Sequence, residues 1–165
     1  MFVITNAELQ RPKWRVAVVA TLAFWMSASL LLDLVIMPGL YSAGMLTEPG
    51  FAAAGYSIFE MFNHLELLCA AVVLTGVLVL RTQKPTGQAY LRATSLALGM
   101  LAIVLIYTYE LTPQMSALGM QLNWFDSALT VPAGMNQLHW SYWILELCKL
   151  AIGGTILRWC WSTSR

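Results

Sequence analysis

The chain has 165 residues, of which 59% are apolar and only 10% are charged, and its mean hydropathy is +0.68. A water-soluble domain carries roughly 25% charged residues, so this composition excludes a surface that faces water throughout. The formal net charge of +1 carries no information here, and the lack of a basic run and of a nucleic-acid motif argues against nucleic acid as a partner. We therefore expect a single transmembrane domain over residues 1–165, with the lipid bilayer as its surroundings.

Four stretches are long and apolar enough to cross about 30 Å of hydrocarbon, which takes about 20 helical residues. The first is expected to stop at Pro38, the second at Arg81, and the third to end or kink at Pro113. Helices are expected because lipid cannot satisfy an open backbone. The sequence thus predicts an all-α, integral membrane four-helix bundle whose spans cover about residues 16–37, 57–80, 93–111 and 140–161.

The basic residues set the expected orientation, because loops on the cytoplasmic side of a membrane are enriched in Lys and Arg. Eight of the nine lie before the first span, between the second and the third, or at the end of the fourth and beyond it. The segments that follow the first and third spans contain none. We therefore expect a multi-pass protein of the bacterial plasma (inner) membrane with both termini in the cytoplasm.

A weak internal repeat relates the two halves of the chain. Asp33 precedes Pro38 at the end of the first span, and Glu110 precedes Pro113 at the end of the third. The second and fourth spans each contain the sequence Leu-Glu-Leu. Duplication of a two-helix hairpin would produce this pattern, and chance similarity between apolar helices explains it equally well.

The ionisable side chains within the spans are the candidate functional residues, because a charged group at the bilayer centre costs about 2.5–3.5 kcal/mol on insertion scales. Glu60 and His64 share a helix face, whereas Glu66 points about 160° away from His64. We expect Glu146 and five other residues to line one cavity that opens outward, with separate, locally satisfied pairs as the alternative. Those five form the candidate ion, metal or proton site: Asp33, Glu60, His64, Glu110 and His139.

Three kinds of chemistry fit this cluster. Carboxylates and imidazoles bind metal ions, and thioethers favour soft ions such as Cu(I). Two histidines from different spans suit haem, and carboxylates inside a bundle suit a proton or ion path. No compact ligand motif selects among them, so the metal and any cofactor stay open. Six of the nine methionines lie on the outer side, where they also serve as ordinary apolar filler: Met37, Met45, Met61, Met115, Met120 and Met135.

Lys149 is the one basic residue near the expected bilayer middle, where it needs a carboxylate partner. Glu146 lies one helical turn away on the same face, and Glu66 on the second span lies at a similar depth. We expect these three residues to form a buried charge network with an excess of negative charge. A purely structural pair of Glu146 and Lys149, or a protonated glutamate, is the alternative.

Several short motifs resemble those of a known family. In chain order they are similar to the transmembrane protein 205-like family, whose members are uncharacterised four-span proteins of bacteria and eukaryotes. The resemblance covers most of the chain and implies the four-span fold without implying a chemistry. It rests on Phe24-Trp25-Met26-Ser27, Val35-Ile36-Met37-Pro38-Gly39-Leu40, Ile58-Phe59, Phe62-Asn63, Leu111-Thr112-Pro113-Gln114-Met115 and Gln137-Leu138-His139-Trp140-Ser141.

The chain contains no phosphate-binding loop, nucleophile elbow or dinucleotide fingerprint, which argues against an enzyme. The first functional hypothesis is a small membrane protein that binds or transports a small cation or metal ion through its outer acidic and histidine cluster. The second is a non-catalytic accessory or assembly subunit that joins a larger membrane complex, or a homo-oligomer. The third is a haem-binding redox protein.

Overall fold

The computed structural model is helical in every regular element that it describes, and it describes residues 6–45, 50–82, 88–125 and 134–162. Two elements are single turns of π-helix, which are marked η. The all-α class expected from the sequence is confirmed. In chain order the elements are α1 (Asn6–Leu31), η1 (Leu32–Ile36), α2 (Met37–Ser42), α3 (Phe51–Thr82), α4 (Gln88–Ile106), η3 (Tyr107–Leu111), α5 (Thr112–Phe125) and α6 (Met135–Ser162).

Three helical segments are long and apolar enough to cross a membrane: Lys13–Ser42, Phe51–Thr82 and Gln88–Gly119. Helix α6 is 28 residues long but is not among them. Large apolar side chains face outward from every long helix, which gives the molecule an apolar exterior. Examples are Phe24, Leu68, Leu98 and Leu147.

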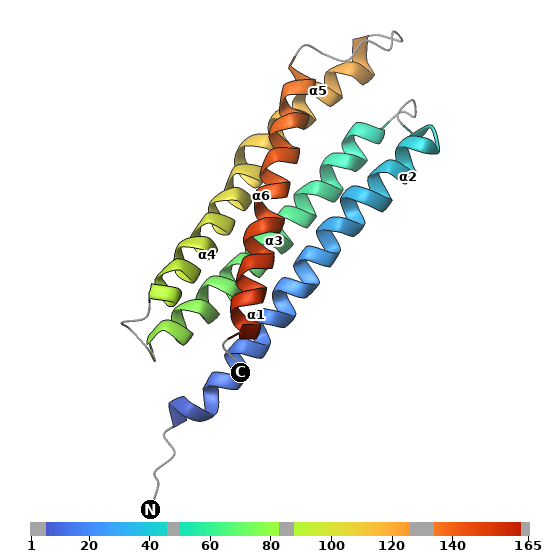
Figure 1. Ribbon diagram of the computed structural model, residues 1–165. Coiled ribbons are helices and arrows are strands. Elements are labelled where there is room, and N and C mark those ends of the chain that lie inside the picture. Colours follow the sequence, from blue (N-terminus) through green and yellow to red (C-terminus); the bar gives the residue numbers. More distant parts are fainter. Residues whose placement is uncertain (1–5, 46–49, 83–87, 126–133, 163–165) are drawn as a thin grey trace, which may run out of the picture.

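The long helices alternate in direction, so both chain ends lie at one end of the molecule (Figure 1). We call this the terminus end. The opposite end, which we call the pocket end, is formed by α2, α5 and the first turns of α3 and α6 (Figure 1). Elements α1, η1 and α2 follow one another without a break and form one rod, and α4, η3 and α5 form another.

Two glycines lead the chain into the helices of the pocket end. Gly50 and Gly134 directly precede α3 and α6 and have φ angles of 90° and 98°. Residues with a Cβ atom rarely adopt positive φ, so glycine suits both positions. The Gly50 carbonyl accepts a hydrogen bond from the N–H of Ala54 at 2.9 Å, and the Gly134 carbonyl accepts one from Leu138 at 3.1 Å. The carbonyl of each glycine therefore accepts a hydrogen bond from the first turn of the helix that follows it.

Both π-turns lie just before a proline. Pro38 comes two residues after η1, and Pro113 comes two residues after η3. Proline has no N–H, and its ring collides with the carbonyl four residues earlier. A wider π-turn, in which an N–H bonds the carbonyl five residues back, accommodates that ring. The expectation that Pro38 stops the first helix is therefore wrong, because the helix continues to Ser42, and the second rod likewise continues past Pro113 to Phe125.

The larger cluster of buried apolar residues lies toward the terminus end, and a second one, formed by Ile103, Tyr107 and Leu111, continues toward the pocket end. Two glycines allow close helix packing toward the terminus end. A Cβ atom on Gly76 would overlap the Val18 side chain, and one on Gly153 would lie 2.9 Å from the sulfur of Met26. Small side chains on α3, α4 and α6 thus bring the backbones together. The buried core residues include Val18, Leu22, Ala70, Val73, Val77, Ala97, Met100, Val104 and Ile156.

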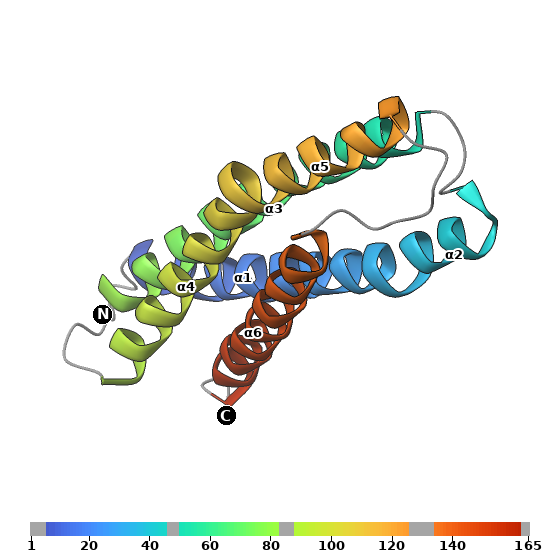
Figure 2. The same cartoon turned by 90° about the horizontal axis from the view of Figure 1, so that it is seen from above.

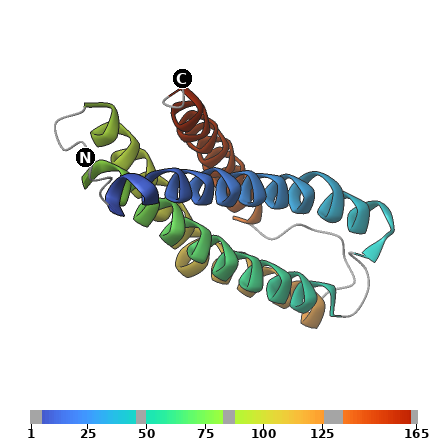
Figure 3. The ribbon, with the colours of Figure 1, turned by 90° about the horizontal axis from the view of Figure 1, so that it is seen from below.

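At the pocket end the first rod separates from the other helices. Within the described residues, the backbones of η1 and α2 make no close contact with α3, α5 or α6, whereas α1 packs against both α3 and α6. Figure 2 shows α2 diverging from α3 and α5, and Figure 3 shows the same divergence from below. Side chains, rather than direct backbone packing, therefore connect the outer part of this rod to the rest of the molecule.

Candidate functional site

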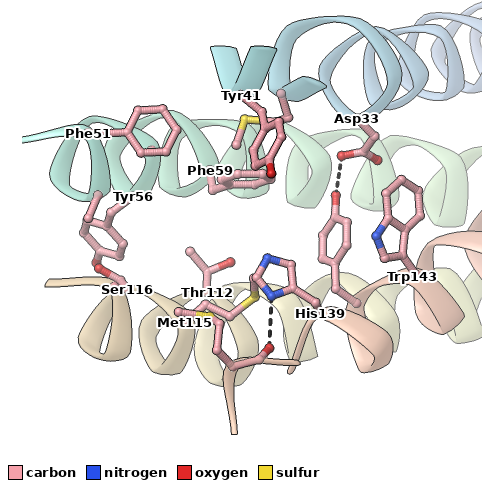
Figure 4. Close-up of a pocket in the computed structure, with 16 residues that line it drawn as sticks. Asp33, Tyr41, Phe51, Tyr56, Phe59, Thr112, Met115, Ser116, His139 and Trp143 are labelled. Atoms are coloured by element: carbon pink, nitrogen blue, oxygen red, sulfur yellow. Dashed lines mark hydrogen bonds between the residues drawn. The ribbon is translucent and has the colours of Figure 1, made fainter. Parts of the chain in front are cut away.

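A pocket of about 500 Å³ occupies the space where α2 diverges from α3, α5 and α6 (Figure 4). This volume is in the range of small-molecule sites, about 300–1,000 Å³. Its walls are mainly aromatic and contain few polar side chains. The six aromatic residues that line it are Tyr41, Phe51, Tyr56, Phe59, Tyr142 and Trp143.

Few polar groups reach the pocket. Asp33 is the one carboxylate among its lining residues, and Thr112, Ser116 and His139 also contribute polar atoms. Ser116 Oγ is buried and has no hydrogen-bond partner among the described residues. The pocket is therefore an apolar cage with a few convergent polar groups, as is typical of small-molecule sites.

A single side-chain hydrogen bond joins the first rod to α6 at the edge of the pocket. Asp33, which is 7% exposed, lies in η1, and its Oδ1 accepts a hydrogen bond from the Tyr142 hydroxyl at 2.6 Å. Figure 4 shows this bond between the two helices. We call it the Asp33–Tyr142 clasp. Because the backbones of η1 and α6 are not in contact, the clasp helps to set the distance between them.

From the clasp, a series of contacts between aromatic and charged side chains runs toward the middle of the molecule. The Tyr142 ring packs on the Tyr107 ring with their centroids 5.1 Å apart. The Tyr107 hydroxyl donates a hydrogen bond to Glu146 Oε2 at 3.1 Å. Lys149 Nζ lies 2.7 Å from the same carboxylate oxygen. The pocket is thus connected to a buried ion pair through two tyrosines.

The structure brings Lys149 into contact with both of the glutamates expected from the sequence. Its Nζ lies 2.5 Å from Glu66 Oε1 and between the two carboxylates. Glu66 also accepts hydrogen bonds from Trp25 Nε1 at 2.8 Å and from Ser29 Oγ at 3.1 Å. All three charged side chains are at most 3% exposed. In their ordinary charge states, two carboxylates and one ammonium leave an excess of one negative charge.

The hydrogen-bond donors in this cluster are shared unequally between the carboxylates of Glu66 and Glu146. Glu66 Oε1 has three donors, whereas Glu146 Oε1 is buried and has no partner among the described residues. The Lys149 ammonium also lies 5.2 Å from the centre of the Tyr107 ring and 6.0 Å from that of Trp25, within reach of cation–π attraction. Glu66 is thus the better satisfied carboxylate, and Glu146 is the one that lies toward the pocket.

The other sequence candidates lie apart from the pocket. Glu60 and His64 do share a face, but it is exposed on the outside of α3, and His64 Nδ1 lies 2.7 Å from the Glu60 carbonyl oxygen. Glu110 is also exposed and accepts a hydrogen bond from Gln114 at 3.2 Å. The helical period explains this result, because α3 turns Asn63 inward and so turns residues 60 and 64 outward.

The expected cavity of six converging residues is therefore wrong as a whole. Asp33 and His139 line the pocket, Glu146 is buried beneath it, and the remaining three point outward. The two histidines lie on different surfaces, so they do not form a paired haem site. In the described part of the chain, no three His, Cys, Asp or Glu side chains come together as metal ligands.

The aromatic residues of the site were absent from the sequence candidates. Tyr142 lies three residues after His139 and four before Glu146, so helical periodicity alone would have placed it on their face. Tyr107 had no such signal, because its partner Glu146 belongs to another helix. The same holds for Trp25, which bonds Glu66 across 41 positions of sequence.

Comparison with known proteins assigns no relatives to this fold or site. No protein-family model matches the chain, no curated protein sequence matches it, and no solved structure matches it. The likeness to the transmembrane protein 205-like family stays a prediction from short motifs. The function must therefore be inferred from the geometry of the site.

Proposed function

We propose that the chain is a four-span protein with both termini in the cytoplasm and the pocket end on the opposite side of the membrane. Basic residues of the described ranges lie toward the terminus end, as the positive-inside rule requires, among them Lys13, Arg15, Arg81, Arg92 and Arg158. The ion pairs of α6 are buried, while its Ile144 and Leu147 face outward. Mutual neutralisation of Glu146 and Lys149 lowers the cost of placing α6 in lipid.

We propose that this protein binds a small organic cation in its pocket. The observation that supports this function is the combination of six aromatic walls with one buried carboxylate, Asp33. Aromatic faces attract cations by about 0.5–2 kcal/mol each, and cages of this kind suit quaternary ammonium groups. The Asp33 carboxylate supplies the opposite charge, and the apolar surface holds the organic part of the ligand.

The buried charge network beneath the pocket adds to this preference for positive charge. With both glutamates ionised, its two carboxylates exceed its one ammonium, which makes its field at the pocket negative. An organic cation is weakly hydrated, so it loses less hydration energy on entering an apolar pocket than a metal ion does. The negative field and the aromatic walls thus favour the same ligand class.

The test is titration of the detergent-solubilised protein with benzyltrimethylammonium, with neopentylbenzene as an uncharged probe of the same shape. We expect the cation to bind and the uncharged probe to bind at least tenfold more weakly, which corresponds to about 1.4 kcal/mol. Asp33→Asn should lower the affinity for the cation at least tenfold. Glu110→Gln removes an exposed carboxylate outside the pocket and should leave the affinity unchanged.

Two results would reject this function. One is equal binding of the charged and uncharged probes, which would mean that the pocket selects shape alone. The other is an equal effect of Asp33→Asn and Glu110→Gln, which would mean that the cation responds to the overall charge rather than to the pocket.

A role as a subunit of a larger membrane complex is the second candidate, and the outward face of α3 supports it. Glu60 and His64 are exposed on the mostly apolar outward face of a helix that is long enough to cross a membrane. Polar groups that face lipid are costly unless a protein partner or the interface covers them. We expect mild detergent to extract a stoichiometric complex that the double change Glu60→Leu and His64→Leu disrupts. Extraction of a single chain in both cases would exclude this role.

A further inference from the structure

The pocket has a second set of ligating side chains that the proposed function does not use. Three methionines and one histidine line it from different elements: Met37 from α2, Met115 from α5, and Met135 and His139 from α6. Figure 4 shows Met115 and His139 on the α5 and α6 side of the pocket and Asp33 on the first rod across from them. Met115, Met135 and His139 therefore lie on the opposite wall from the Asp33 carboxylate that would hold an organic cation, whereas Met37 lies on the same rod as Asp33.

The orientation of His139 leaves one ring nitrogen available as a ligand. Its Nδ1 lies 3.0 Å from the Met135 carbonyl oxygen. A carbonyl oxygen only accepts hydrogen bonds, so Nδ1 must carry the proton, and the neutral ring then has its lone pair on Nε2. A backbone carbonyl that fixes the Nδ1 proton is the arrangement usual for metal-binding histidines. Among the described residues, Nε2 has no hydrogen-bond partner.

The helix spacing places a thioether on the same face of α6 as the His139 ring. Met135 and His139 are four residues apart on α6, so their side chains share one face. Met115 reaches the same region from α5, which packs against α6. Met135 is buried, and Met115 and Met37 are half-buried. Two thioethers and an imidazole thus lie on one wall, and the third thioether comes from the opposite rod.

We propose that these side chains form a binding site for a soft monovalent metal ion, Cu(I) or Ag(I). Thioether sulfur selects soft ions over the harder Zn²⁺, Mg²⁺ and Ca²⁺, which need carboxylate, imidazole or thiolate ligands. The described residues provide no cluster of three such ligands. Thioethers carry no proton and form no disulfides, so this donor set stays competent in an oxidising compartment. The site goes beyond the proposed function, since it takes a different ligand through different residues.

Silver is the probe, because Ag(I) has the same ligand preference as Cu(I) and is stable in air. Calorimetric titration of the detergent-solubilised protein with silver nitrate in a chloride-free buffer should give one tight site per chain. X-ray absorption at the silver edge should show sulfur neighbours together with one nitrogen. The test variant carries Met115→Leu and Met135→Leu, which keep the apolar volume of the pocket. The matched control is Met61→Leu, which removes a methionine that is 77% exposed on the outside of α3.

We expect the double variant to lose at least tenfold in silver affinity, and His139→Asn to lose the nitrogen neighbour. The control should bind silver as the unmodified protein does. Benzyltrimethylammonium affinity should fall more in Asp33→Asn than in the double variant, and silver affinity should fall more in the double variant than in Asp33→Asn, so the two proposals fail independently. Equal silver affinity in the double variant and the unmodified protein would overturn the site, as would an equal loss in the control.

Discussion

The two ends of this molecule differ in how closely the first rod packs against the other helices. Toward the terminus end, small residues bring four helical segments into direct contact, as where Gly76 meets Val18. Toward the pocket end α3 and α5 stay closely packed, as where Gly119 meets Ala52, but η1 and α2 leave the other helices. Among the described residues, the hydrogen bond of the Asp33–Tyr142 clasp connects η1 to α6 across the gap. The first rod is thus held by apolar packing at one end and by a polar side-chain contact at the other.

Because of this difference, we expect the terminus end to contribute most to stability and the pocket end to bind the ligand. Close apolar packing gains dispersion and hydrophobic energy but leaves no space for a ligand. Divergence of the helices gives up part of that energy and opens a pocket of about 500 Å³. The buried cluster of Glu66, Glu146 and Lys149 lies between the closely packed terminus end and the pocket. Substitutions at the two ends should therefore change different measurable properties.

The largest expected loss of stability comes from substitutions in the buried cluster of Glu66, Glu146 and Lys149. Lys149→Met leaves two carboxylates buried without their shared cation, and breaking a buried ion pair costs about 3–5 kcal/mol. The midpoint of thermal unfolding in detergent should fall accordingly. The double change Lys149→Met and Glu146→Gln should be less harmful than the sum of the two single changes. Simple additivity of the three variants would show that the side chains do not act as a pair.

A large residue at a close helix contact should have the next largest effect. Gly76→Leu places its side chain against Val18 and should destabilise the protein by about 1–3 kcal/mol. The matched change at the other end is Gly55→Leu, where a Cβ atom would meet nothing within 4 Å although the residue lines the pocket. We expect Gly55→Leu to keep the unfolding midpoint and to weaken ligand binding. The reverse outcome would contradict the separation of the two ends.

A smaller effect is expected from removal of the clasp. Tyr142→Phe deletes the hydroxyl that bonds Asp33 but keeps the ring that packs on Tyr107. Because Asp33 lines the pocket, water can replace the lost donor, and the loss of stability should be about 1 kcal/mol. Spin labels on α2 and α6 should report a wider distance distribution in this variant. An unchanged distribution would mean that the clasp does not hold the first rod.

The smallest effect is expected on the outer surface of α3. Glu60→Gln changes an exposed carboxylate and should alter stability by no more than about 0.5 kcal/mol. Glu66→Gln, six positions further along the same helix, replaces a carboxylate with three donors and should be clearly destabilising. Similar unfolding midpoints for the two variants would contradict the distinction between inward and outward acids on α3.

The sequence by itself determined the helical class and the position of the apolar segments, because both depend on local composition. The expected spans at 16–37, 57–80 and 93–111 lie within helices that the structure extends at both ends. The uneven distribution of the basic residues was also evident from the sequence. The sequence predicted a carboxylate partner for Lys149 as well, because an isolated charge in an apolar helix is costly. Periodicity also placed Glu60 and His64 on one face.

Only the tertiary structure decided which way each face points and where the helices part. Helical spacing showed that Glu60 and His64 lie together, but it did not show that α3 turns them away from its neighbours. Pro38 and Pro113 suggested helix ends, whereas packing keeps both helices continuous through a π-turn. The pocket depends on the divergence of α2, which no local signal encodes. Its aromatic walls come from three helices, α2, α3 and α6, and the angles between helices follow from the packing of all their side chains together.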